Sequence, residues 1–88
     1  MLNVKEDIDS LFKSYNIKKY IINEDMSVDV DGNVSLSKLD IVELPVKFRN
    51  VSGDFWCNNN KLTSLEGCPV DVGGFFGCDR NEITNYVR

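Results

Sequence analysis

The sequence lacks residues and spacings on which several common functions depend. It contains no histidine, and its three cysteines include no Cys-x-x-Cys pair. Histidine-based acid–base catalysis is therefore excluded, and a zinc site would lack its usual ligands and spacing. An odd number of cysteines cannot close a complete set of disulfides, so we expect Cys57, Cys68 and Cys78 to be free thiols in a reducing cytosol.

Targeting and membrane patterns are also missing. No apolar run approaches the roughly 18 residues that a membrane-spanning helix needs. The first ten residues, MLNVKEDIDS, are charged and have no apolar region of a secretory signal. We therefore expect a cytoplasmic protein without a membrane partner.

Positive charge is scarce as well. Ten Lys and Arg stand against 14 Asp and Glu, which gives a net charge of −4. This balance argues against direct binding of nucleic acid, because the chain has no excess of Lys and Arg to neutralise phosphates. No Ser-Lys or Cys-His pair has motif spacing, and no glycine loop could cradle a phosphate. We therefore expect no enzyme activity, no cofactor and no small-molecule substrate.

One acidic stretch has a spacing that bears on metal binding. Asp29, Asp31 and Asn33 follow the D-x-D-x-N pattern of a calcium loop, and Asp40 stands at the twelfth position. The glycine falls at the fourth position instead of the sixth, and the flanking residues are strand-like. These features favour an acidic turn and no metal site.

The sequence does contain an internal repeat. The stretch from Val51 to Asp71 aligns without gaps with the stretches that begin at Val30 and at Val72, an offset of 21 residues each time. Equivalent columns are apolar or glycine in all three rows: Val30/Val51/Val72, Gly32/Gly53/Gly74, Val34/Phe55/Phe76, Leu36/Cys57/Cys78, Ile41/Leu62/Ile83 and Leu44/Leu65/Tyr86. A constant offset of this size is typical of a solenoid, in which Leu62 and Leu65 should both be buried.

The residues before the repeats predict a cap. Apolar residues at helical spacing indicate a helix over 3–15, with Asn3 as its N-terminal cap and Asn16 as its end. Alternating residues at 18–23 and 27–30 predict a β-hairpin. The other interpretation of the helix, as an element that binds a partner or a membrane surface, is less consistent with its mixed charges.

We therefore predict one domain, residues 1–88, of the α+β class. A capping helix and β-hairpin occupy residues 1–29. About three 21-residue coils follow at 30–50, 51–71 and 72–88, and their short strands form a parallel sheet. Gly53 permits close approach of neighbouring coils, and the amides of Asn60 and Asn81 should form a ladder that satisfies backbone groups.

The repeat resembles a leucine-rich repeat. Phe55–Leu62 and Phe76–Ile83 fit the pattern L-x-L-x-x-N-x-L, whereas the row from Val34 to Ile41 has Leu39 at the asparagine position. The segment LTSLEGCP, together with INED, VDVDG and VSGDF, resembles segments of short repeat proteins of bacteriophages and prophages.

That resemblance implies a non-catalytic, phage-encoded interaction protein in the cytosol of the host cell. Its partner would be a host or phage protein. The implied role is to bind, and to inhibit, a host enzyme or a defence complex such as a CRISPR effector or a nuclease.

Strand alternation predicts which residues such a protein would use. Side chains that alternate with the buried columns point to solvent, and the candidate partner-binding set is Asp54, Trp56, Asn58, Phe75 and Asp79, with Arg80 at the rim. Exposed aromatic residues on neighbouring strands are typical of protein interfaces. The alternative is that Trp56 and Phe75 cover each other or pack beneath the hairpin.

A second hypothesis is self-assembly through the last coil. The candidate interface residues are Phe76, Ile83, Tyr86 and Val87, which would face outward along the solenoid axis. Two copies that meet there about a twofold axis would form a homodimer. In the competing interpretation, Tyr86 folds over the last coil as a cap.

Overall fold

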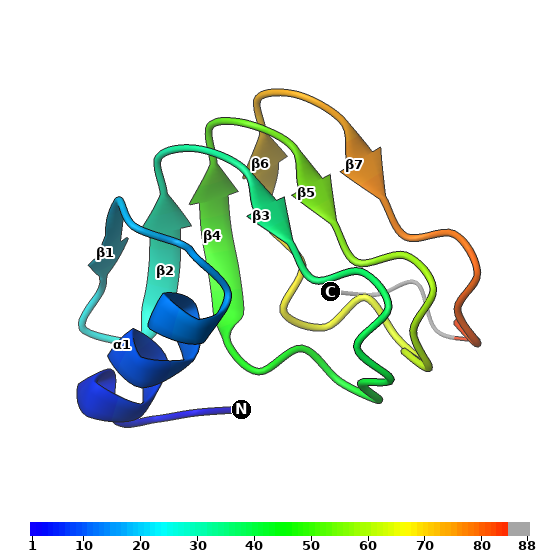
Figure 1. The fold of residues 1–88 in the computed structure, drawn as a ribbon, viewed down its shortest axis with the longest axis horizontal. Coiled ribbons are helices and arrows are strands. Elements are labelled where there is room, and N and C mark those ends of the chain that lie inside the picture. Colours follow the sequence, from blue (N-terminus) through cyan, green and yellow to red (C-terminus); the bar gives the residue numbers. More distant parts are fainter. Residues whose placement is uncertain (85–88) are drawn as a thin grey trace.

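One helix and seven short strands make up the computed structural model, which describes residues 1–84 (Figure 1). The elements are α1 (Lys5–Ser14), β1 (Tyr20–Ile22), β2 (Ser27–Val30), β3 (Val34–Ser35), β4 (Lys47–Val51), β5 (Phe55–Trp56), β6 (Asp71–Val72) and β7 (Phe76–Gly77). The predicted α+β class is confirmed. The predicted hairpin is confirmed too, as antiparallel β1 and β2.

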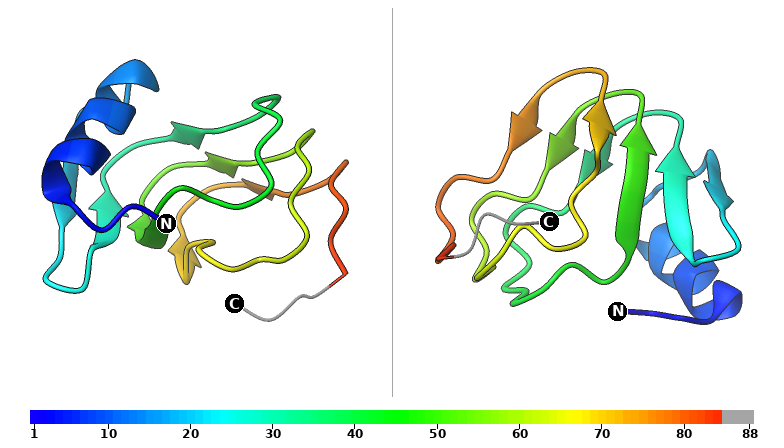
Figure 2. Two further views of the ribbon diagram at one scale, coloured as in Figure 1. Left: turned by 90° about the horizontal axis from the view of Figure 1, so that it is seen from below. Right: turned by 180° about the vertical axis from the view of Figure 1, so that it is seen from behind.

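The strands form two sheets, where the sequence had predicted one for the repeats. The first sheet has the order β1-β2-β4-β6 and is parallel except for β1, and the second has the order β3-β5-β7 and is parallel throughout. Figure 2 shows the two sheets on different sides of the molecule. The prediction of a single sheet missed β4 and β6.

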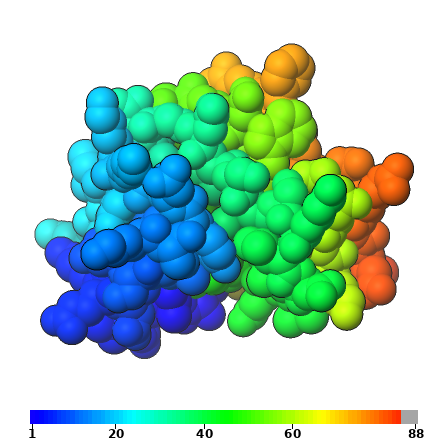
Figure 3. Space-filling model, viewed as in Figure 1, coloured from blue at the N-terminus to red at the C-terminus, as the bar shows by residue number. Residues whose placement is uncertain are grey.

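Residues that pair across the parallel strands are mostly 21 positions apart. Val34 pairs with Phe55, and Phe55 pairs with Phe76. In the other sheet, Val51 pairs with Val30 on one side and with Val72 on the other. The space-filling view shows the result, since the colours advance across the surface from the blue N-terminal residues to the orange later strands (Figure 3).

The helix packs against the beginning of this arrangement. Ile8 and Phe12 are fully buried, and the Phe12 ring lies parallel to that of Phe48, with centroids 6.0 Å apart. The helix ends at Ser14 with Tyr15 as its C-cap, and Asn16, which was predicted to stop it, follows with a positive φ of 60°. The predicted cap by Asn3 is wrong, because Val4 occupies the N-cap position and makes no side-chain hydrogen bond there.

The core lies between the two sheets and beneath the helix. Its fully buried residues include Val28, Leu36, Leu44, Phe48, Phe55 and Leu62. Leu62 is buried as predicted. Leu65 is only partly buried, which corrects the prediction for that position.

The predicted asparagine ladder is present. Asn60 Nδ2 donates to the carbonyl of Leu36, and Asn60 Oδ1 accepts from the backbone N–H of Leu39. Asn81 does the same one level later, donating to the carbonyl of Cys57 and accepting from the N–H of Leu62. The amides therefore satisfy backbone groups that the turns leave unpaired.

Candidate functional site

Trp56 and Phe75 lie together on the outer side of the second sheet. Their rings stack with centroids 6.2 Å apart at an interplanar angle of 27°. Phe75 is 71% exposed, whereas Trp56 is partly buried. The predicted patch therefore exists, and the alternative is partly correct as well, because the two rings cover each other.

Gly77 provides the surface on which the indole rests. Trp56 and Gly77 are cross-strand partners of β5 and β7. A Cβ atom at position 77 would come within 2.5 Å of Trp56 Cε3, so any side chain there would displace the ring. The glycine thus allows the indole to lie flat over β7 and to present one broad apolar surface with Phe75.

Asp54 holds the backbone beneath this aromatic pair. Its Oδ1 accepts a 2.8 Å hydrogen bond from the N–H of Phe75, and its own N–H donates to Asn33 Oδ1, also at 2.8 Å. These side chains come so close that a Cβ atom at Gly53 would lie 2.1 Å from Asn33 Oδ1, and one at Gly74 would lie 2.0 Å from Asp54 Oδ1. The glycine column predicted for close approach serves to admit these side-chain hydrogen bonds.

The other predicted partner-binding residues lie at the ends of β5 and β7. Asn58 Oδ1 accepts a hydrogen bond from Ser37 Oγ. Asp79 and Arg80 are exposed, and Arg80 has a positive φ of 55°, like Asn59 one level earlier with 58°. Asn58, Asp79 and Arg80 therefore follow the two strands that carry Trp56 and Gly77.

The predicted self-assembly residues are described in part. Phe76 is 42% exposed and stacks on Phe55 with centroids 5.7 Å apart, and Ile83 is partly buried. Val70, with 60% exposure, lines a hollow of about 300 Å³ together with Phe76. Tyr86 and Val87 lie outside the described residues.

The cysteines are free thiols, as predicted. Cys57 is fully buried, and a hydrogen bond with Cys68 together with burial raises the pKa of its thiol well above the ordinary value. Burial also raises the pKa of the Cys78 thiol. Such thiols stay protonated at neutral pH, which is the opposite of an activated nucleophile.

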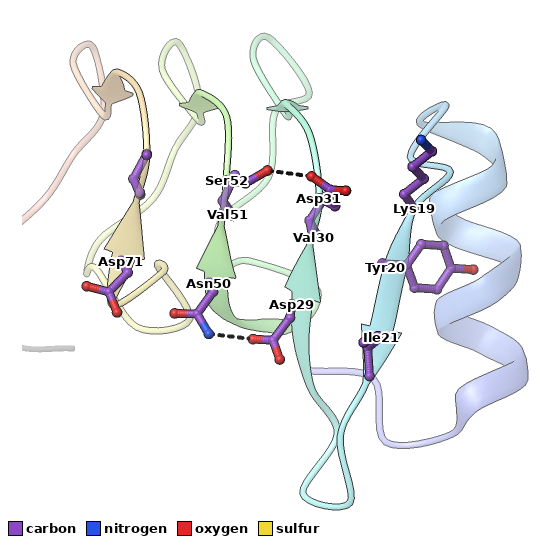
Figure 4. A pocket seen from close by; sticks show the side chains of 12 residues that line it. Lys19, Tyr20, Ile21, Asp29, Val30, Asp31, Asn50, Val51, Ser52 and Asp71 are labelled. Atoms are coloured by element: carbon purple, nitrogen blue, oxygen red, sulfur yellow. Dashed lines mark hydrogen bonds between the residues drawn. The ribbon is translucent and has the colours of Figure 1, made fainter.

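A hollow of about 610 Å³ lies on the outer side of the first sheet (Figure 4). It was not predicted from the sequence. Asp29 lies at its edge and accepts hydrogen bonds from Arg49 Nε and Asn50 Nδ2, both at 2.9 Å. The guanidinium of Arg49 is the main reason that the pKa of the Asp29 carboxyl is lowered. The signal that could have revealed this side is a second polar column, Asp29/Asn50/Asp71, at the same 21-residue offset.

The residues with calcium-loop spacing make separate hydrogen bonds. Asp29 binds Arg49 and Asn50, Asp31 accepts from Ser52 Oγ, and Asn33 accepts from Asp54. Within residues 1–84 no group of three or more carboxylate or thiol side chains could hold a metal ion. No helix in that part of the chain is long and apolar enough to cross a membrane.

Comparisons with models of known protein families, with curated proteins and with solved structures found no match to this chain.

Proposed function

We propose that this chain is a short leucine-rich-repeat-like solenoid, of about three 21-residue coils behind a helical cap, that binds another protein without catalysing a reaction. The constant 21-residue pairing of Val34 with Phe55 and of Phe55 with Phe76 supports the solenoid. The backbone hydrogen bonds of Asn60 and Asn81 support the leucine-rich-repeat likeness.

The observation that carries the binding proposal is the aromatic pair on the second sheet. Phe75 is 71% exposed, whereas Phe48 and Phe55 are buried in the core. Leaving a phenylalanine in water forgoes the roughly 1.5–3 kcal/mol that its burial would contribute. A partner that covers it recovers this free energy, and Trp56 beside it belongs to the residue type most enriched in binding hot spots.

The charges around the pair define the partner surface. Asp54 and Asp79 are carboxylates on the same side of the sheet, and Arg80 follows Asp79 at the rim. We expect a partner with an apolar pocket for Phe75 and a mainly basic rim. In line with the resemblance to phage repeat proteins, the proposed partner is a host enzyme or defence complex in the cytosol, such as a CRISPR effector or a nuclease, and binding would inhibit it.

The test is capture of partners from bacterial lysate with matched surface variants. Phe75→Ser removes the more exposed aromatic ring of the pair. Val42→Ser is the control, since Val42 is 63% exposed and lies outside the second sheet. We expect the unmodified chain and Val42→Ser to capture the same protein, and Phe75→Ser and Trp56→Ala to lose it. Equal capture by all four proteins would refute the proposed binding surface.

A second candidate function is self-assembly through the end formed by β6 and β7. Exposure of Phe76 and Val70 around the hollow at that end favours it. Light scattering after size exclusion at about 100 μM would test this function, because interfaces of moderate size associate in the micromolar range. A dimer that Val70→Glu disrupts would support it, and a monomer at that concentration would exclude it.

A further inference from the structure

The hollow on the first sheet has the shape of a groove that crosses the strands. Its floor is the backbone around Val30, Val51 and Val72, whose side chains pack toward the core. Two rows of side chains border this floor (Figure 4): Ile21, Asp29, Asn50 and Asp71 form one row, and Lys19, Asp31 and Ser52 form the other. Gly73, which has no side chain, also lines the groove after β6. A volume of about 610 Å³ is within the range of ligand and peptide sites.

Two carboxylates of the groove keep their charge uncompensated. Asp29 is neutralised by its ion pair with Arg49. The carboxylate of Asp71 is exposed and has no hydrogen bond or ion pair among residues 1–84, and the carboxylate of Asp31 accepts only from the uncharged hydroxyl of Ser52 within that part of the chain. Lys19 is the one basic residue that lines the groove, at its β1 end. The part between β2 and β6 is therefore negative.

The two free carboxylates have a fixed spacing. Asp29, Asn50 and Asp71 are in register across β2, β4 and β6, and Asp31 lies two residues beyond Asp29. Asp31 and Asp71 are thus two strand spacings apart, about 10 Å, and on opposite rows that are about 7 Å apart. An extended chain advances by about 10 Å in three residues, and side chains an odd number of positions apart point to opposite sides.

We propose that this groove binds an extended segment of another protein in which two lysine or arginine residues are three positions apart. The segment lies across β2, β4 and β6, with one basic side chain toward Asp31 and the other toward Asp71. The aliphatic parts of both side chains lie along the floor of the groove, with their charged ends at the carboxylates. Lys19 repels basic residues at the β1 end and so fixes where the segment stops.

Peptide titration followed by amide chemical shifts tests this spacing directly. The probe is the capped hexapeptide Ala-Lys-Ala-Ala-Lys-Ala, and the control is Ala-Lys-Ala-Lys-Ala-Ala, which has the same charge but both lysines on one side. At low ionic strength we expect the probe to shift the amide signals of Asn50, Ser52 and Gly73, and to bind more tightly than the control.

Charge variants complete the test. Asp71→Asn should weaken binding of the probe by about two- to fivefold, the usual effect of one exposed ion pair. Lys19→Gln should strengthen it, and Glu66→Gln, an exposed site outside the groove, should leave it unchanged. The proposal is overturned if both peptides bind equally, if Asp71→Asn has no effect, or if the shifts gather at Trp56. The last result would leave the proposed binding surface of the second sheet standing.

Discussion

Asn60 and Asn81 donate to one and the same acceptor. The Nδ2 atom of each side chain lies 3.0 Å from the carbonyl oxygen of Cys57, so one backbone group joins two levels of the protein. Asn60 is almost completely buried, whereas Asn81 is partly exposed. The same side-chain amide therefore makes this hydrogen bond once in a buried position, at Asn60, and once near solvent, at Asn81.

The first prediction uses this difference. Asn60→Ala should lower the free energy of unfolding by about 2–5 kcal/mol, because it leaves the buried carbonyl of Leu36 and the N–H of Leu39 without their partner. Asn81→Ala should cost less, since water can replace part of its hydrogen bonding. Chemical denaturation measures both variants. Equal losses would contradict the ladder as described.

The second prediction concerns two leucines of one segment. Leu62→Ala should destabilise the protein by about 2–5 kcal/mol, as expected for a fully buried side chain. Leu65→Ala should cost clearly less, because Leu65 is only partly buried. Thermal unfolding of the two variants in parallel provides the comparison. A greater loss for Leu65→Ala would refute this account of the core.

The third prediction concerns the Cys57 thiol. Its pKa is raised in the folded protein, so it contributes stability below the unfolded pKa of about 8.5, and this contribution is lost as the pH rises above that value. The melting temperature should therefore fall above about pH 8.5. A thiol reagent should modify Cys57 only after denaturation and Cys78, which is partly exposed, earlier. Rapid labelling of native Cys57 would refute the burial.

The fourth prediction concerns Asp29, whose pKa is lowered mainly by Arg49. A lowered pKa means that the stability from this pair is present at neutral pH and is lost as the pH falls through the acidic range. Arg49→Gln should raise the Asp29 pKa toward its ordinary value, as carbon NMR of the carboxyl group would show. Lys61→Gln is the control, since Lys61 pairs with Asp40 instead. No change in Arg49→Gln would exclude the ion pair.

The fifth prediction concerns the indole of Trp56. Gly77→Ala places a Cβ atom where the ring lies, so the indole must move outward and its fluorescence should shift to the red and become more accessible to a quencher. Ser35→Ala, on the other neighbour of Trp56 in the sheet, should leave the emission unchanged. If Gly77→Ala has no effect on the emission, the indole does not rest on that glycine.

Local patterns in the sequence were sufficient for part of the fold. The hairpin of β1 and β2, the strands at Phe55 and Phe76, and the ladder of Asn60 and Asn81 were all predicted correctly. Each depends on alternation or on a side chain that bonds to nearby backbone. The aromatic pair of Trp56 and Phe75 was found for the same reason.

Other features depend on contacts that no local pattern encodes. β6 has only two residues, Asp71 and Val72, and is a strand because it pairs with β4. The partial burial of Trp56 follows from Gly77 on the next strand, and the groove follows from rows that four strands build together. The predicted cap by Asn3 failed because the helix begins after Val4.

The constant pairing offset has a consequence for protein engineering. Most residues that pair across the parallel strands are 21 positions apart, as Phe55 is from Val34 and from Phe76. A duplicated copy of residues 51–71 inserted after residue 71 would find matching hydrogen-bond partners on both sides. It would lengthen the molecule by one strand spacing, about 4.8 Å, and leave the helical cap untouched. Chains built in this way would form a graded series in length from a single sequence.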